Sequence, residues 1–293
     1  METIETGQTI YRRTLELVLQ QGELIGQTMQ GIPCLRYQVP PPMRFRLKDG
    51  APLITERRIG FWRPAIGEIF AFINGVRTQA GLEEFGCRWW DKWVSAEKCA
   101  DFGLPTGDLG PGSYGAAFHD FPDVGSKTFN QWEALIANIK DRPWARTHFV
   151  SPWIPPLVIS RPRQVVVAPC HGWVQVMIND QREMDLVMYQ RSADLPIGVP
   201  ANLIQYSAVL LALAQVCGCQ PRTYVHILAD AHIYLDQVPA VEEMLAREPR
   251  PLPMLLINEE GRQLSNIFDF RHRHFTIEGY DPHPAIDNIP VGI

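Results

Sequence analysis

Apolar residues recur at helical spacing in several long segments of the chain. Residues 9–21 (TIYRRTLELVLQQ) carry apolar side chains every three or four positions, which predicts an amphipathic helix. A second helix is predicted at 63–75, with Pro64 at its start and Gly75 near its end. Residues 201–217 (ANLIQYSAVLLALAQVC) are apolar almost throughout, which predicts a helix buried in the core.

Shorter alternating or apolar runs predict β-strands between and after these helices. The stretch 31–48 is interrupted by prolines, which predicts short strands and a turn, and the Gly-, Pro- and Asp-rich stretch 95–126 predicts a long loop. No internal repeat or linker composition divides the chain, so we expect one α/β domain over residues 1–293. Further strands are predicted at 147–153, 164–168, 172–179, 183–189, 224–230, 255–257 and 275–280, and further helices at 129–140 and 239–248.

Composition and charge narrow the class of protein. With 46% hydrophobic residues, the chain can bury a sizeable core. A net charge of −5 argues against broad binding to nucleic acids or membrane surfaces. The first residues lack the apolar segment of a signal peptide, and Asn202, Gln205 and Gln215 interrupt the apolar helix, which argues against a membrane span. We expect a cytoplasmic protein with reduced thiols.

The cysteines do not follow metal-ligand spacing, and the pair in VCGC is one residue too close for a C-x-x-C motif, so no metal site is expected. Cys170, in APCH (168–171), is a candidate nucleophile because thiolates near cations or hydrogen-bond donors are reactive. A lone cysteine is, however, more often buried and unreactive. The residues alone leave both roles open.

Glu68 lies in the apolar helix predicted at 63–75. An unpaired buried carboxylate is costly, so Glu68 must be paired, protonated or exposed to a cavity. A raised pKa would suit a general acid or base. Pairing with Arg63, or capping a loop, would instead make Glu68 structural.

Polar residues also interrupt the segment YQRSADLPIGVPAN (189–202). Arg191 and Ser192 offer a guanidinium and a hydroxyl that suit a phosphate group. The amide of Asn202 can donate and accept, so it can read the edge of a pyrimidine. Taken alone, these residues together with Asp194 favour the interpretation of a polar network that holds a turn.

Three more polar residues alternate along the predicted strand end ADAHIY. Asp230, His232 and Tyr234 are two positions apart, which places them on one face of the strand. They are candidates either for ligand contacts or for a satisfied network in the core.

In this order, the motifs resemble the thymidylate synthase family, folate-dependent enzymes that methylate deoxyuridylate. The resemblance covers nearly the whole chain and implies a single domain with a large mixed β-sheet flanked by helices. It also implies a homodimer in which arginines of one subunit reach the phosphate bound to the other. The matching segments are AIGE (65–68), WDKW (90–93), DLGP…YG (108–115), VSPW (150–153), APCH, YQRSAD, GVPAN (198–202), DAHIY (230–234), REPRPLP (247–253) and EGYDPHPAI…VGI (278–293).

What the resemblance implies is the reductive methylation of dUMP to dTMP. Cys170 would add to carbon 6 of the pyrimidine, so that carbon 5 attacks the methylene of 5,10-methylenetetrahydrofolate. Glu68 would organise proton transfers with Asn202, Tyr114 and His171. The folate would also donate a hydride and leave as dihydrofolate.

The resemblance further assigns binding residues. Asparagine at 202 favours a uracil ring, since the family's cytidylate hydroxymethylase relatives carry aspartate there. The remaining expected contacts are Arg146, Arg191 and Ser192 with the phosphate, His232 and Tyr234 with the sugar, Asp194 with the pterin, Trp90 beside the folate, and the C-terminal Val-Gly-Ile, ending at Ile293, as a closing segment.

The sequence departs from the family pattern at the phosphate site. Gln30 stands where the family has an arginine, and Thr147 follows Arg146 in place of a second arginine. Charge-assisted hydrogen bonds are worth roughly 1.5–3 kcal/mol each, so two losses would weaken nucleotide binding greatly. Arg36 and Arg142 are candidate replacements. Ala201 also stands where the family usually has phenylalanine.

These departures leave alternatives open. One is a 5-hydroxymethylase acting on dUMP, UMP or CMP, in which water rather than hydride captures the methylene. Another is a nucleotide-binding homologue without catalytic activity. Trp90 and the VGI ending resemble the methylating branch, which favours methylation, and the acidic composition offers no support for RNA binding.

Overall fold

The apolar segment near the middle of the sequence forms the central helix of the fold. The computed structural model describes residues 7–125 and 127–292, and in it helix α8 (Gly198–Val216) is buried along most of its length. Helix α2 (Trp62–Ile73) packs against α8 and is also almost fully buried. By length and composition α8 could cross a membrane, but 83% of its apolar window is buried inside the fold.

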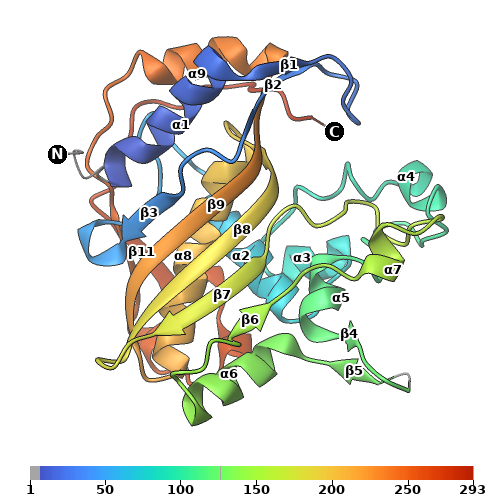
Figure 1. Cartoon of the computed structure of the whole chain (residues 1–293), viewed down its shortest axis with the longest axis vertical. Helices are drawn as coiled ribbons and strands as arrows, with labels where there is room; N and C mark the ends of the chain where they lie inside the picture. The colour runs from blue at the N-terminus through green and yellow to red at the C-terminus, as the bar shows by residue number, and fades with distance from the viewer. Residues whose placement is uncertain (1–6, 126, 293) are drawn as a thin grey trace.

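A mixed β-sheet covers one side of these two helices (Figure 1). In the described part of the chain it is seven-stranded, with the order β1-β2-β9-β8-β7-β6 and with β3 paired to β9. Strands β8 and β9 run parallel, and the other neighbours are antiparallel. The strands are β1 (Glu23–Ile25), β2 (Cys34–Gln38), β3 (Met43–Arg46), β6 (Phe149–Val150), β7 (Trp173–Ile178), β8 (Glu183–Asp194) and β9 (Gln220–Tyr234).

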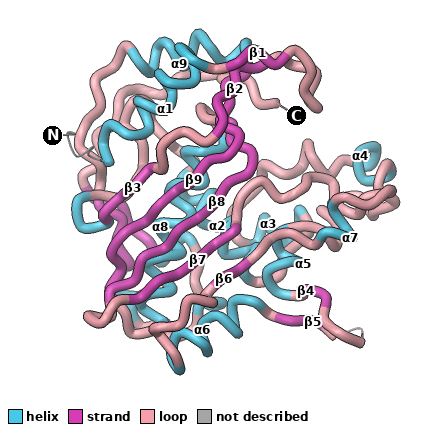
Figure 2. The backbone as a smooth tube through the Cα atoms, viewed as in Figure 1, coloured by secondary structure: helices cyan, strands magenta, loops and turns pink. Residues whose placement is uncertain are grey.

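Smaller elements surround this framework (Figure 2). Two short hairpins are formed by β4 (Phe121–Pro122) with β5 (Thr128–Phe129), and by β10 (Met254–Ile257) with β11 (Phe275–Glu278). The remaining α-helices are α1 (Gly7–Gln21), α3 (Gln79–Glu84), α4 (Ala96–Ala100), α5 (Tyr114–His119), α6 (Gln131–Asp141), α7 (Pro155–Val158), α9 (Val238–Leu245) and α10 (Glu259–Arg262).

The two faces of the sheet differ. Alternate residues of β7 and β8, such as Val176 and Leu186, are buried on the side that packs on α8. The other side faces the viewer in Figure 1, where no helix of the described chain covers it. There Phe149, Met177 and Tyr189 are exposed by 52%, 43% and 39%. An apolar sheet face without cover is typical of an interface with another molecule.

The structure confirms the predicted fold class, a mixed sheet flanked by helices, and the three long helices. The strand predicted at 147–153 is observed only at Phe149–Val150, and the strand predicted at 224–230 runs from Gln220 to Tyr234. Three further differences stand out. Residues 164–168 form no strand, the stretch 95–126 contains α4, α5 and β4 rather than only a loop, and the strand predicted at 183–189 continues to Asp194. The last difference places Arg191 and Ser192 on a strand rather than in a turn.

Candidate active site

A cleft of about 590 Å³ opens where β2, β8 and β9 meet the loop before β7. Of the predicted site residues, Cys170, Arg191, Ser192, His232 and Tyr234 line this cleft, together with Gln30. The cleft also receives side chains that the sequence did not single out, including Lys98, Asp101, Phe102 and Arg163. Its volume is in the range of small-molecule sites.

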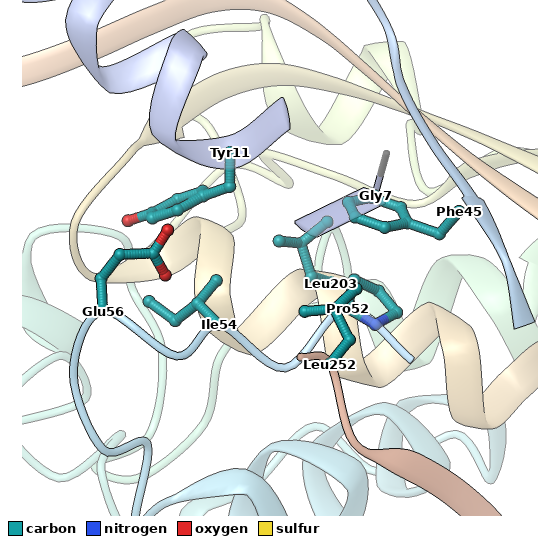
Figure 3. Close-up of a pocket in the computed structure, with 8 residues that line it drawn as sticks. All are labelled: Gly7, Tyr11, Phe45, Pro52, Ile54, Glu56, Leu203 and Leu252. Atoms are coloured by element: carbon teal, nitrogen blue, oxygen red, sulfur yellow. The ribbon is translucent and has the colours of Figure 1, made fainter. Parts of the chain in front are cut away.

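A second cavity, between α1 and the start of α8, has a volume of only about 10 Å³ (Figure 3). Leu203, Leu252 and Ile54 line it with the side chains of Tyr11 and Glu56. This space holds at most one water molecule. It is therefore a packing gap and not a substrate site.

The Cys170 thiol is half-buried at the base of the large cleft. Its Sγ atom is 3.7 Å from Nη2 of Arg191 and 3.5 Å from the carbonyl oxygen of Ala168. Burial raises the pKa of this thiol, while the Arg191 charge and a hydrogen bond with Tyr114 act in the opposite direction. In this arrangement burial outweighs the arginine, so the thiol form is favoured until more positive charge or a bound ligand changes the balance.

Arg191 also fixes the loop that carries the thiol. Its Nε donates to the carbonyl of Pro169 at 2.7 Å, and its Nη2 donates to the carbonyl of Ala168 at 2.9 Å. Its backbone N–H donates to the carbonyl of Cys170, and its guanidinium lies 5.4 Å from the centre of the Trp153 ring. Among the described residues none accepts from Nη1, which leaves that group for an anion.

Glu68 is buried and accepts hydrogen bonds from three neighbouring side chains. Its Oε1 accepts from the indole N–H groups of Trp89 at 2.6 Å and Trp90 at 2.5 Å, and its Oε2 accepts from Nε2 of Gln205 at 2.6 Å. Burial raises the pKa of Glu68 even though these donors favour the charged form. A buried carboxyl of this kind suits proton transfer near neutral pH.

Arg63 does not pair with Glu68, because its guanidinium stacks over the Trp62 ring at 4.2 Å. Trp90 donates its indole N–H to Glu68 and is not among the residues that line the cleft. Its expected place beside the folate stays a prediction. The segment bearing both tryptophans comes close to α2 because residue 67 is glycine, where a Cβ atom would lie 2.1 Å from the carbonyl oxygen of Phe85.

Tyr114 and His171 lie directly beside Cys170. The Tyr114 hydroxyl accepts from the backbone N–H of Cys170 at 2.6 Å, and the Tyr114 ring stacks on His171 at 4.6 Å. His171 Nδ1 is 2.7 Å from the hydroxyl of Tyr206. Burial lowers the pKa of His171 to about 3, so the imidazole is neutral at physiological pH and does not act there as a cation.

The predicted sugar-binding residues come together in the same cleft. Asp230, His232 and Tyr234 all line it from β9, as their alternation predicts. His232 Nδ1 is 2.9 Å from the Asp230 carboxylate, which holds the imidazole in place. Ser192 lies opposite Asp230 in the sheet register.

Asp194 is set back from the cleft and connects to the C-terminal segment. Gln237 Nε2 donates to both carboxylate oxygens, at 3.1 and 3.3 Å, and to the carbonyl of Pro290 at 2.9 Å. Burial raises the pKa of Asp194 to about 6. Gly292 packs so closely on the Tyr234 ring that a Cβ atom would lie 2.7 Å from it. Ile293, the expected closing residue, lies outside the described residues.

Of the residues expected to bind phosphate, some line the cleft in the structure and others do not. Arg146 and Thr147 are exposed near the start of β6, and Arg146 does not line the cleft of its own chain. Of the two candidate replacements, Arg36 lines the cleft, whereas Arg142 pairs with Asp141 outside it. Arg163, from the RPRQ run before the Cys170 loop, also lines the cleft, although no sequence motif pointed to it.

No group of three or more His, Cys, Asp or Glu side chains is placed to hold a metal ion within residues 7–125 and 127–292. Apolar cleft residues such as Trp93, Phe102 and Val167 offer surface for a planar ring instead. The cleft thus offers a thiol and a guanidinium beside a space for an aromatic ligand, while the carboxyl of Glu68 is buried and is not part of its lining.

Comparison with known proteins agrees with this geometry. The thymidylate synthase family model matches residues 9–291. The chain is 36% identical over 255 residues to the bifunctional dihydrofolate reductase-thymidylate synthase of Zea mays, a match that covers 84% of this chain and 47% of the maize protein. The chain thus spans about half the length of that curated relative. With a family match over nearly all of its length, the chain belongs to the thymidylate synthase family of one-carbon transferases.

Proposed function

We propose that the protein methylates carbon 5 of deoxyuridylate, with 5,10-methylenetetrahydrofolate as the one-carbon donor. The observation that carries this proposal is the Cys170 sulfur at the base of the cleft, 3.7 Å from the Arg191 guanidinium. A cation at this distance stabilises the thiolate and so opposes the effect of burial on the thiol. Because Cys170 lines the cleft, a nucleotide bound there could bring its ring to the sulfur.

In the proposed reaction the Cys170 sulfur forms a bond to carbon 6 of the uracil ring. The electron pair of the 5,6 double bond moves onto carbon 5 and the O4 carbonyl, where an N–H of Asn202 can stabilise the developing charge. The folate, when bound, supplies the methylene group and a hydride. Glu68, enclosed from water by Trp89 and Trp90, can relay the protons, including the one that leaves carbon 5. Departure of the sulfur restores the ring double bond.

The phosphate group requires positive charge within reach of Arg191. Besides Arg191, three cations line the cleft, namely Arg36, Lys98 and Arg163. Burial and the Arg191 charge both lower the pKa of Arg163, and both arginines line the same cleft. We infer that Arg163 and Arg36 supply, from the same chain, charge that the family pattern takes from the positions of Gln30 and Thr147.

Replacing Arg163 with alanine is therefore expected to raise the KM for deoxyuridylate by about tenfold or more, with a smaller effect on kcat. The charge removed contacts the phosphate rather than the reacting ring atoms. Steady-state kinetics with varied nucleotide would measure this. Arg142→Ala is the matched control, since it removes an arginine that lies outside the cleft. An unchanged KM in Arg163→Ala would assign the phosphate to other residues.

The function itself is tested by absorbance at 340 nm with deoxyuridylate and methylenetetrahydrofolate. A rise shows that dihydrofolate is formed, as methylation requires. Formation of tetrahydrofolate and a hydroxymethylated nucleotide, detected by mass spectrometry, would support the hydroxymethylase instead. Absence of any product and of a covalent adduct with a 5-fluoropyrimidine nucleotide would leave a nucleotide-binding protein without catalytic activity.

We also propose that two copies of the chain associate through the exposed face of the sheet. The exposed Phe149, Met177 and Tyr189 on that face support this proposal, as does Arg146, exposed beside it and not used in its own cleft. Such an arrangement would let Arg146 serve the cleft of the other copy. Sedimentation that shows only monomers at micromolar concentration would rule it out.

A further inference from the structure

Gln205 connects the two residues to which the proposed function assigns base reading and proton transfer. It lies on α8 one turn after Asn202 and is fully buried. Its Oε1 is 2.9 Å from Asn202 Nδ2, and its Nε2 is 2.6 Å from Glu68 Oε2 and 3.0 Å from the carbonyl oxygen of Ala65. One side chain thus uses its acceptor on one functional residue and a donor on the other.

These contacts fix the orientation of both amides. The backbone carbonyl of Ala65 can only accept, so the atom of Gln205 that faces it must be the nitrogen. The oxygen of Gln205 must then face Asn202, and only the nitrogen of Asn202 can donate to it. Asn202 is left with one N–H and its Oδ1 for a ligand. This assignment follows from partners and does not depend on seeing hydrogen atoms.

We propose that Gln205 is a positioning residue that makes the site selective for uracil over cytosine, an inference that rests on the proposed function. The uracil edge presents an N3–H donor beside the O4 acceptor, which matches Oδ1 and the remaining N–H of Asn202. The cytosine edge has the opposite order, with an N3 acceptor beside an amino group. To match cytosine, the Asn202 amide has to rotate by half a turn.

Rotation of Asn202 is opposed by Gln205. It would place Oδ1 of Asn202 against Oε1 of Gln205, so that two buried acceptors face each other without a hydrogen. Gln205 cannot rotate in compensation, because its amino group is held by both Ala65 and Glu68. The choice of base is therefore set by a residue that has no contact with the base itself.

The test is the ratio of the dissociation constants of deoxycytidylate and deoxyuridylate, measured by calorimetry without folate. In Gln205→Met, which keeps the volume but has no polar atoms, this ratio is expected to fall by about 10- to 100-fold. The fall comes partly from tighter deoxycytidylate binding, since Asn202 can then rotate. Gln215→Met is the control, because Gln215 is also an amide on α8 that donates to two backbone carbonyls, those of Gly261 and Leu264.

A purely structural role for Gln205 would weaken binding of both nucleotides alike and leave the ratio unchanged, which would overturn the proposal. If Gln205→Met does not fold, Gln205→Ser serves instead, since a hydroxyl can donate or accept and no longer fixes Asn202. If the ratio is unchanged in the variant and the unmodified protein methylates deoxyuridylate, only this inference is refuted. Binding of neither nucleotide to the unmodified protein would refute the proposed function as well.

Discussion

Cys170→Ala is expected to lower turnover of deoxyuridylate by more than about 10⁴-fold while the nucleotide still binds. The sulfur is the atom proposed to bond with carbon 6, and it lies 3.7 Å from the Arg191 guanidinium. Among the described residues the other thiol that lines the cleft is that of Cys34, on β2. Removing a nucleophile typically abolishes all catalysis that depends on the covalent intermediate. Dihydrofolate formation at 340 nm measures the loss, and calorimetry measures nucleotide binding.

The control for this variant is Cys219→Ala. Cys219 is also half-buried, but it lies at the start of β9 away from the cleft, with its Sγ near the carbonyl of Cys217. Its replacement should leave turnover within about twofold, since it contacts no cleft residue. Turnover within tenfold of normal in Cys170→Ala would refute the covalent route.

Glu68→Gln is expected to lower kcat by about 10²- to 10⁴-fold, the usual contribution of a general acid or base. Glutamine keeps the size of the side chain and one acceptor for the indoles, but it cannot take up or release a proton. The dependence of kcat on pH should lose the limb that belongs to this carboxyl. Glu56→Gln is the control, because Glu56 is also buried with a raised pKa but lies beside the small cavity near α1.

The same variant should change how stability depends on pH. Burial raises the folded-state pKa of Glu68 above its ordinary value of 4.5, so on raising the pH the unfolded chain releases this proton first. The unfolded state thereby gains stability relative to the folded state as pH rises above 4.5. Glu68→Gln should therefore show a free energy of unfolding that falls less with rising pH. Urea denaturation at pH 5 and pH 7 would measure the free energy of unfolding of both proteins. If it changes with pH by the same amount in Glu68→Gln as in the unmodified protein, the carboxyl is ionised in the fold.

The sequence predicted the long elements because their patterns are strong. Helices α1, α2 and α8 have extended apolar periodicity or continuous apolar runs, and the strands around them alternate. The run QVVVA at 164–168 has the composition of a strand but no strand as a neighbour. Its backbone groups bond instead to Leu109 and Gly112 in a nearby loop and to Leu157 in α7, and only the tertiary structure determines these partners.

Short helices were missed for a related reason. Helix α5 lies in a Gly- and Pro-rich stretch that reads as a loop, yet packing of Tyr114 on Phe72, with ring centres 4.8 Å apart, supports it. Local propensity carries little information about a helix of six residues, since its stability comes from tertiary contacts.

The site could be predicted as a set of residues but not as a geometry. Motif resemblance identified Cys170, Arg191 and His232, which the structure brings to one cleft. It did not indicate that Trp90 serves Glu68. Gln205 was visible in the sequence as a polar residue interrupting an apolar helix, three positions after Asn202, and that spacing was the available signal. No signal in the sequence pointed to Arg163, because Arg191, the cleft residue beside which it becomes important, is distant in sequence.

The two indoles that donate to Glu68 give the protein an optical property. Indole emission responds to the charge and hydrogen bonding of its N–H group, so ionisation of this carboxylate alters the light that Trp89 and Trp90 emit. The chain has eight tryptophans, but the difference spectrum between the protein and Glu68→Gln isolates these two. Trp89 and Trp90 thus form a built-in fluorescent reporter, through which the proton on Glu68 can be followed during a single turnover without any added dye.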